Sequence, residues 1–335
     1  MSPIRTFDVK NVRVEIEDAP ALQFSSGTDC NSPCWWRGGR FYILNSTGHP
    51  TLSSGTDLAH MTRGGEIVYT GWRDGGRWIE SVHQAPDGVL YGWYHNEPQH
   101  LIPAKYQEGH KYGLTAPFIG AVVSHDNGVP WDDLGLVLTA APDALNLETP
   151  NFFFAGGNGD FSVILDQKGE FFYFLIGTYY KDVTQQGVSL ARMAAADLAC
   201  PVGKVFKWHG GGWTEPGLGG KVTPLLPVAA DWYSPGVDAF WGPSVRWNTH
   251  IRQYVILLNR AIDPVWKQEG IYLCLSPNLA DPGSWSAPLR ILDAQGWYPQ
   301  VVGDPAQGET ERVAGRESRL FIHGESKHVI RFDLR

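Results

Sequence analysis

The chain has 335 residues, including 39 Gly, 23 Pro, 14 Trp, 13 Tyr and 15 Phe, and only 19% are charged. Long helices prefer Ala, Leu, Glu and Lys, so this composition excludes a mostly helical protein and favours many short strands joined by turns. The net charge of −8 argues against a nucleic-acid or anionic-membrane partner, and no apolar run approaches the roughly 20 residues that span a bilayer.

The N-terminus, MSPIRTFDVKNVRVEIE, goes straight into an alternating strand pattern and shows no signal-peptide core. The protein is therefore either cytoplasmic or secreted with its signal already removed, and the localisation stays open. Of the four cysteines, Cys30 and Cys34 are four residues apart, but no second pair follows them. This spacing argues against a zinc site and favours buried free thiols, while the redox compartment stays undecided.

Five stretches share one pattern, in which a polar or aromatic opening leads into an apolar strand, a turn and a second aromatic-rich strand. They cover residues 28–47, 78–97, 159–180, 240–261 and 296–326. Each unit leaves room for two further strands, as in AVVSHDNGVPWDDLGLVL after the second unit and GIYLCLSPNLADPGSWSAPLRIL after the fourth. Five units of this kind predict an all-β fold, a five-bladed β-propeller with four antiparallel strands per blade, as one domain over 1–335.

The ends of the chain are expected to close the ring, with the C-terminal HVIRFDLR and the N-terminal residues 12–16 completing one shared blade. Two other architectures compete with this interpretation. A six-bladed propeller, as in sialidases, is disfavoured because only five units are clear. A two-sheet sandwich is disfavoured because the strand–turn–strand pattern repeats.

The stretch SHDNGVPW, residues 124–131, has the form S-x-D-x-G-x-x-W and resembles the Asp-box of sialidases and other β-propellers. We expect a structural hairpin turn here. The carboxylate of Asp126 would accept backbone N–H groups, Gly128 would supply a positive φ, and the ring of Trp131 would fold under the loop.

The innermost strands of a propeller run along the central axis, so residues at their starts converge from different blades. Asp29, Glu80 and Asp160 open the first three units, and aromatic residues open the last two. Carboxylates from several blades ringed by aromatics suit glycosidic-bond chemistry, in which acid and base flank one bond and rings stack on sugar faces. The candidates are Asp29, Glu80 and Asp160 for catalysis, and Asn31, His83, His95, Glu97, Trp241, Arg246, Trp297 and Tyr298 for substrate binding.

The third unit contains Asp160-Phe161-Ser162-Val163, and the fourth contains Trp241-Gly242-Pro243. These motifs resemble those of glycoside hydrolase family 43, the arabinanases and xylosidases with five-bladed propellers, and of related propeller families. Asp160-Phe161-Ser162-Val163, followed by Asp166 and Gly169, matches the family's D-P-S-hydrophobic…D-x-x-G pattern with Phe in place of Pro. The resemblance implies that Asp160 tunes and orients the catalytic acid, and that the base falls near Asn31, with Asp29 two residues earlier. The family's E-G-P reads Trp241-Gly242-Pro243 here, so its acid is absent from the usual position.

The sequence and the resemblance together predict a glycoside hydrolase acting on a plant or microbial glycan by inversion. Asp29 is expected to be the base and Glu80 the acid, with exchanged roles or Glu97 as the acid left open. Each carboxylate also has a structural interpretation, with Asp29 and Asp160 as turn residues and Glu80 as a paired strand residue.

Two other functions stay open. One is a non-catalytic glycan-binding propeller, which the tryptophan at 241 favours. The other is a sialidase-like exo-glycosidase, which would need an arginine cluster such as Arg246 and Arg260 and a tyrosine nucleophile. No cofactor is expected, although a structural calcium or sodium ion in the central channel, beside His323, stays open. The sequence leaves the sugar, the linkage, endo or exo action and the oligomeric state undetermined.

Overall fold

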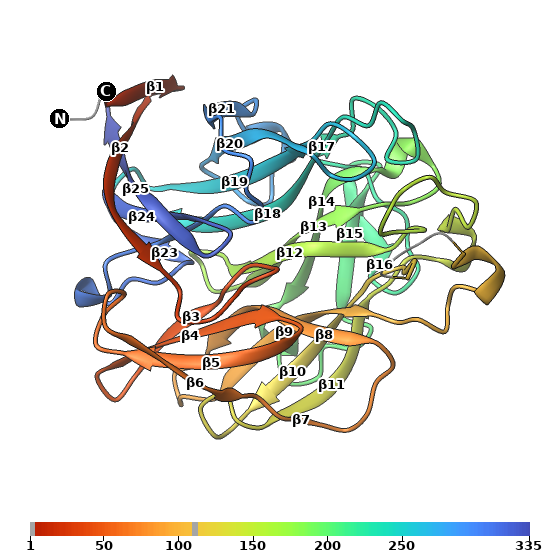
Figure 1. The fold of residues 1–335 in the computed structure, drawn as a ribbon, viewed down its shortest axis with the longest axis horizontal. Coiled ribbons are helices and arrows are strands. Elements are labelled where there is room, and N and C mark those ends of the chain that lie inside the picture. Colours follow the sequence, from red (N-terminus) through yellow and green to blue (C-terminus); the bar gives the residue numbers. More distant parts are fainter. Residues whose placement is uncertain (1–3, 109–112) are drawn as a thin grey trace.

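The computed structural model describes residues 4–108 and 113–335, which form five small antiparallel sheets placed around a common centre (Figure 1). This arrangement confirms the predicted all-β, five-bladed propeller. Within the described residues, helical structure consists of 3₁₀ turns of three residues each, and none is long or apolar enough to cross a membrane. They are Ala104–Tyr106, Pro142–Ala144, Val183–Gln185, Ala195–Asp197, Pro282–Ser284 and Pro305–Gln307.

The first three blades follow one another along the chain, each built from successive antiparallel strands. Blade 1 contains β3 (Cys34–Arg37), β4 (Arg40–Thr47), β5 (His49–Gly55) and β6 (Met61–Glu66). Blade 2 contains β8 (Gly76–Gln84), β9 (Leu90–Glu97), β10 (Phe118–Ser124) and β11 (Trp131–Leu138), with β7 (Tyr69–Thr70) parallel to β11. Blade 3 contains β12 (Asn158–Leu165), β13 (Phe171–Thr178), β14 (Gly187–Ala194), β15 (Val205–His209) and β16 (Gly212–Pro216), with β17 (Leu226–Pro227) pairing β14.

Blade 4 follows the same plan, and blade 5 is shared between the first and the last strands of the chain, which lie side by side in Figure 1. Blade 4 contains β18 (Ala239–Asn248), β19 (Gln253–Ala261), β20 (Gln268–Ser276) and β21 (Leu289–Leu292), with β23 (Val313–Ala314) parallel to β18. Blade 5 contains β22 (Gln300–Val302), β24 (Glu317–Ile322), β25 (Glu325–Leu334), β2 (Val12–Gln23) and β1 (Arg5–Val9). Because β2 pairs with β25, the predicted closure of the ring is confirmed.

The apolar core is divided among the junctions between neighbouring blades. Trp35 and Leu44 of blade 1 pack against Ile79 of blade 2, for example, and Trp93 of blade 2 packs against Phe161 of blade 3. Further clusters join blade 3 to blade 4, blade 4 to blade 5, and blade 5 back to blade 1. Alternate strand residues face each junction, so the burial of these faces holds the inner strands close to the axis.

The turn at residues 124–131 connects β10 and β11 and has Gly128 at φ 90°, as expected. Its Trp131 ring is fully buried. The turn is held differently from the Asp-box prediction, however. Ser124 Oγ accepts the N–H groups of Asp126 at 3.3 Å and Gly128 at 2.9 Å, whereas the Asp126 side chain is exposed. The Ser124 hydroxyl at the end of β10, and not the predicted Asp126 carboxylate, is therefore the acceptor in this turn.

Candidate active site

The inner strands of blades 2, 3 and 4 all carry a break in strand register near their starts. The break lies at Glu80 in β8, at Asp160 in β12, and at Gly242 and Pro243 in β18. A β-bulge adds an unpaired residue and redirects its side chain, and bulges are common beside active sites. Because β12 contacts both β8 and β18, these three breaks meet at one end of the propeller centre.

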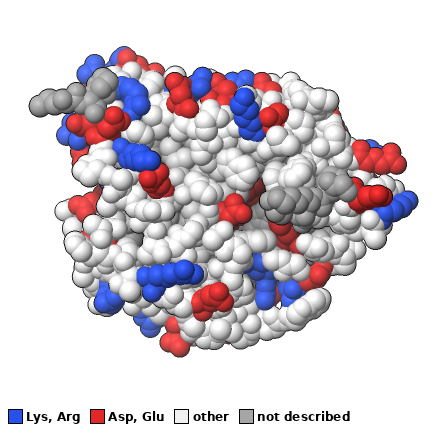
Figure 2. Space-filling view, in the orientation of Figure 1, with Lys and Arg blue, Asp and Glu red and all other residues white. Residues whose placement is uncertain are grey.

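A pocket with a volume of about 100 Å³ opens at this end. On the face shown in Figure 2, acidic side chains lie near the middle. The pocket walls combine four carboxylates, one imidazole, one thiol and six aromatic rings from all five blades and their loops. The lining residues are Asp29, Cys30, Trp78, Glu80, His95, Glu97, Phe153, Phe154, Asp160, Trp266, Trp297 and Tyr298.

The structure therefore brings together seven of the residues selected from the sequence. They are Asp29, Glu80, His95, Glu97, Asp160, Trp297 and Tyr298.

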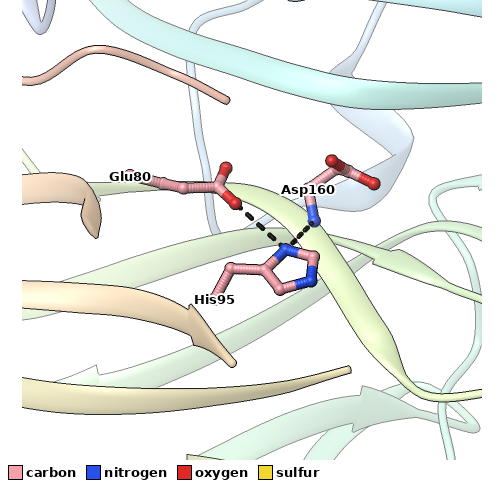
Figure 3. A group of neighbouring side chains, drawn as sticks. All are labelled: Glu80, His95 and Asp160. Carbon is pink, nitrogen blue, oxygen red and sulfur yellow. Dashed lines mark hydrogen bonds and ion pairs between the residues drawn. The ribbon is translucent and has the colours of Figure 1, made fainter. Parts of the chain in front are cut away.

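An imidazole lies between two glutamates in the pocket wall. Nδ1 of His95 is 3.2 Å from Oε1 of Glu80, and Nε2 is 3.4 Å from Oε1 of Glu97 (Figure 3 shows the Glu80 side). The second oxygen of Glu80, Oε2, accepts the backbone N–H of Phe161 at 3.1 Å. Glu80 is thus tied both to its own blade and to the bulge of blade 3.

Asp160 is buried and occupies a left-handed backbone conformation, with φ 43°. Its Oδ2 accepts the hydroxyl of Tyr179 at 2.7 Å. Its backbone N–H points at Nδ1 of His95 from 3.4 Å, as Figure 3 shows. Left-handed conformations of residues other than glycine persist where the surrounding structure enforces them, often at functional sites. Here Tyr179 fixes the side chain and the bulge fixes the backbone.

Asp29 is more exposed to solvent than the other three pocket carboxylates. Its backbone N–H donates to the Ser46 carbonyl at 2.6 Å, which anchors the segment before β3. Among the described residues, no hydrogen bond or ion pair engages its carboxylate, so both oxygens are available to water or a ligand.

Burial and crowding shift the pKa values of this group. Although Asp29 is an exposed residue, its carboxylate lines the pocket, and this partial burial, followed by the charges of Asp160 and Glu97, raises its pKa to about 6. Burial also raises the pKa of Glu80 to about 7, against the opposing effect of His95, and raises the pKa of Asp160. Burial works against a charged His95, but its contacts with Glu80 and Glu97 prevail and raise its pKa well above the usual value. The pocket can therefore hold protonated and ionised groups side by side near neutral pH.

Four predicted binding residues lie outside the pocket. Asn31 is buried, and its amide donates to the carbonyls of Phe161 and Pro243 at 2.8 and 3.0 Å, which fastens blade 1 to blades 3 and 4. The His83 ring packs 4.9 Å from the Phe172 ring, and burial, with the nearby Arg312, lowers its pKa to about 4.

The two predicted binding residues of blade 4 are also placed away from the cavity. Trp241 is fully buried behind the pocket wall, where its indole N–H donates to Gln268 at 3.1 Å and its ring meets that of Trp266 edge to face. Arg246 is buried with its guanidinium 5.1 Å from the Phe332 ring, and burial lowers its pKa to about 9. Neither side chain can contact a ligand in the pocket.

The pocket also includes residues that the sequence analysis missed, namely Cys30, Trp78, Phe153, Phe154 and Trp266. Trp78 lies two residues before the bulged Glu80 in β8, so its position in the second unit was a usable indication. Trp266 and the two phenylalanines lie in connecting segments, before β20 and β12, where strand periodicity gives no indication.

A cation would find donors in Glu80, His95 and Asp160, whose potential ligand atoms lie within 4.8 Å of one another. These atoms already form hydrogen bonds with one another, with a backbone N–H group and with a tyrosine hydroxyl. We therefore interpret the group as a hydrogen-bond network. His323 lies in the exposed turn between β24 and β25, away from the pocket lining. The ion in the central channel stays a prediction.

The arginine cluster of a sialidase-like site is not found in the described part of the pocket, whose lining contains no arginine. Arg260 instead pairs with Asp238 through two hydrogen bonds of 2.6 and 2.7 Å. Arg246 is the buried residue described above. The geometry therefore does not favour carboxylate-bearing sugars as ligands.

Comparisons with solved structures show the same fold over most of the chain. The chain is similar to an endo-arabinase from Bacteroides thetaiotaomicron, with 13% identity and a TM-score of 0.54, covering 92% of this chain and 95% of that one. It is also similar to a thermostable family-43 glycoside hydrolase, with 12% identity, a TM-score of 0.51, and coverage of 93% and 92%. A family-43 β-1,3-galactosidase with galactodeoxynojirimycin matches with 14% identity, a TM-score of 0.50, and coverage of 93% and 94%. No family model matches the chain, and no curated protein matches it.

Proposed function

We propose that this five-bladed propeller is a glycoside hydrolase that cleaves a plant or microbial glycan. One observation carries the proposal: four carboxylates from three blades meet in one aromatic-lined pocket, and only Asp29 among them is open and without a partner. Structurally similar proteins described as an arabinase, a family-43 glycoside hydrolase and a galactosidase support it.

The reaction we propose is a single displacement with inversion. Asp29 removes a proton from water, and the water attacks the anomeric carbon while a glutamate of blade 2 protonates the leaving oxygen. Asp160, held by Tyr179, adjusts the charge around these groups. The half-buried rings of Trp78 and Trp297 offer faces for stacking on the sugar.

The pKa shifts predict a bell-shaped dependence of activity on pH. Asp29, with a pKa raised to about 6, becomes a competent base as the pH rises through that value. The proton held by Glu80, whose pKa is raised to about 7, is lost as the pH rises further. Activity should therefore peak between about pH 6 and pH 7.

The experiment compares the wild-type protein with Asp29→Asn on arabinan, xylan, galactan and a panel of aryl glycosides. Release of reducing sugar by the wild type is expected, with a loss of about 10²–10⁴-fold in Asp29→Asn because water is no longer activated. Asp87→Asn, an exposed aspartate in the turn before β9, is the matched control and should keep full activity. NMR of the first product would report inversion at the anomeric carbon.

A second candidate function is non-catalytic glycan binding, which the tryptophan in place of the family's acid favours. Isothermal titration of arabinose, xylose and galactose oligosaccharides would distinguish the two. Heat of binding from substrates that the wild type never cleaves would replace the hydrolase proposal with this one.

A further inference from the structure

We infer that Glu97 delivers the proton to the leaving oxygen, and that His95 connects it to Glu80, which holds the proton in reserve. This inference rests on the proposed function and assigns the acid for the same pocket. The group Glu80, His95 and Glu97 is called the blade 2 relay below.

The first argument is access. The Glu80 side chain is 0% exposed although it forms part of the pocket wall, and each of its oxygens already has a partner. The Glu97 side chain is 32% exposed and lines the same pocket. A general acid must come within hydrogen-bond reach of the oxygen that it protonates, and only Glu97 offers a free surface for that contact.

The second argument is continuity. Glu80 and Glu97 lie on neighbouring strands, β8 and β9, and the His95 ring spans the distance between them with contacts of 3.2 and 3.4 Å. The edge of the ring is fixed by Trp78, whose centroid lies 5.9 Å away at 86°. Nδ1 is hydrogen-bonded to Glu80, while Nε2 lies 3.4 Å from Glu97 without forming a hydrogen bond, so a small movement of the partly exposed Glu97 side chain would complete the proton path.

The third argument is the lack of another donor. The position that carries the acid in the family is Trp241 here, and its ring is fully buried behind the pocket wall. The other accessible carboxylate, Asp29, lies on blade 1 and is assigned to the water. Asp160 is buried and accepts the hydroxyl of Tyr179.

The proton steps balance within the relay. Glu97 gives its proton to the leaving oxygen as the glycosidic bond breaks, and the bonding electrons stay with that oxygen. In the starting state both glutamates carry a proton, so the negative charges that raise the pKa of His95 are absent and the ring is neutral, with its hydrogen on Nε2. Nε2–H of His95 then passes its proton to Glu97, and Nδ1 takes the proton from Glu80. The relay ends with Glu80 ionised, and Glu80 is reprotonated from solvent through the same groups before the next turnover.

The surroundings favour a stored proton in this relay. Asp160 and Asp29 face it from blades 3 and 1, while Cys30 and Tyr298 complete the titratable lining, and no lysine or arginine lines the described pocket. These negative charges and burial together disfavour a fully ionised relay, in line with the raised pKa of Glu80.

Leaving-group dependence tests the assignment. Glu97→Gln is expected to lose about 10²–10⁴-fold on glycosides with alkyl or sugar leaving groups, but less than about 10-fold on 2,4-dinitrophenyl glycosides, which leave without protonation. Glu66→Gln, on the exposed outer strand β6, is the matched control and should be unchanged on both.

Glu80→Gln tests the reserve. It should slow hydrolysis and move the alkaline limb of the pH profile to lower pH, because Gln cannot hold the proton, whereas a purely structural role would leave the profile in place. The inference is overturned if Glu97→Gln loses equal activity on both classes of substrate, or if Glu80→Gln alone shows the leaving-group dependence. If the wild type cleaves no glycoside at all, the proposed function fails instead.

Discussion

The starts of β12 and β18 have nearly the same backbone but opposite chemistry. Each strand breaks register at this point, and each places a residue in the left-handed region, Asp160 at φ 43° and Gly242 at φ 58°. In blade 3 this residue directs a carboxylate into the pocket. In blade 4 it has no side chain, and the preceding Trp241 is buried behind the wall. The fold thus repeats a backbone position, while the residue placed there determines whether the position takes part in chemistry.

Blades 3 and 4 also differ in the hydrogen bonds that they form with the next blade. Ser81 Oγ accepts the N–H of Val163 at 2.9 Å, and Ser162 Oγ accepts the N–H of Val245 at 3.0 Å. These bonds join blade 2 to blade 3 and blade 3 to blade 4 just after the bulges. Ser244 occupies the matching place in blade 4, where no such bond to the described part of blade 5 forms.

The largest effect is expected from placing an acid in blade 4. Trp241→Glu should lower the free energy of unfolding by roughly 3–5 kcal/mol, since it removes a buried indole and leaves a carboxylate without a partner. It should add no activity, because this side chain lies behind the pocket wall. Urea unfolding and assays on unactivated glycosides measure both outcomes, with Trp241→Phe as the control that keeps a buried ring. A stable Trp241→Glu protein with raised activity would show that blade 4 still offers the acid's position.

A smaller effect is expected from removing the charge in blade 3. Asp160→Asn keeps the shape but removes a negative charge that raises the pKa values of Glu80 and Asp29. Both pKa values should fall, so both limbs of the pH–rate profile should move to lower pH, and activity at pH 7 should drop about 10–100-fold as the acid loses its proton earlier. The measurement is kcat/KM against pH on one glycoside. A profile like that of the wild type would show that Asp160 only caps the bulge.

The smallest effect concerns the serines beside the bulges. Ser81→Ala and Ser162→Ala should each lower the free energy of unfolding by about 1–2 kcal/mol, because a buried N–H of the next blade loses its acceptor. Ser244→Ala is the matched control and should change stability by less than about 0.5 kcal/mol. Denaturant midpoints compare the three variants. Equal losses at all three positions would mean that the hydroxyls do not distinguish the blades.

The sequence by itself determined the architecture and the main carboxylates of the pocket. Strand periodicity and turn residues are local properties, so the five units could be recognised from the sequence. The acidic residues at the starts of these units then indicated a site at one end of the central axis. Asp29, Glu80 and Asp160 could be placed in the pocket by that argument, because the inner strands of a propeller all start near the same end of the central axis.

Only the tertiary structure decided which residues near the starts of the inner strands line the pocket and which are buried behind its wall. A bulge shifts the two-residue period of a strand, so counting along β18 could not show that Trp241 and Arg246 are buried away from the pocket. Trp266 reaches the pocket from a loop that has no period. The difference in access between Glu80 and Glu97 depends on how two strands and the bulge of blade 3 pack together. Such contacts join residues far apart in the chain, and local pattern carries no information about them.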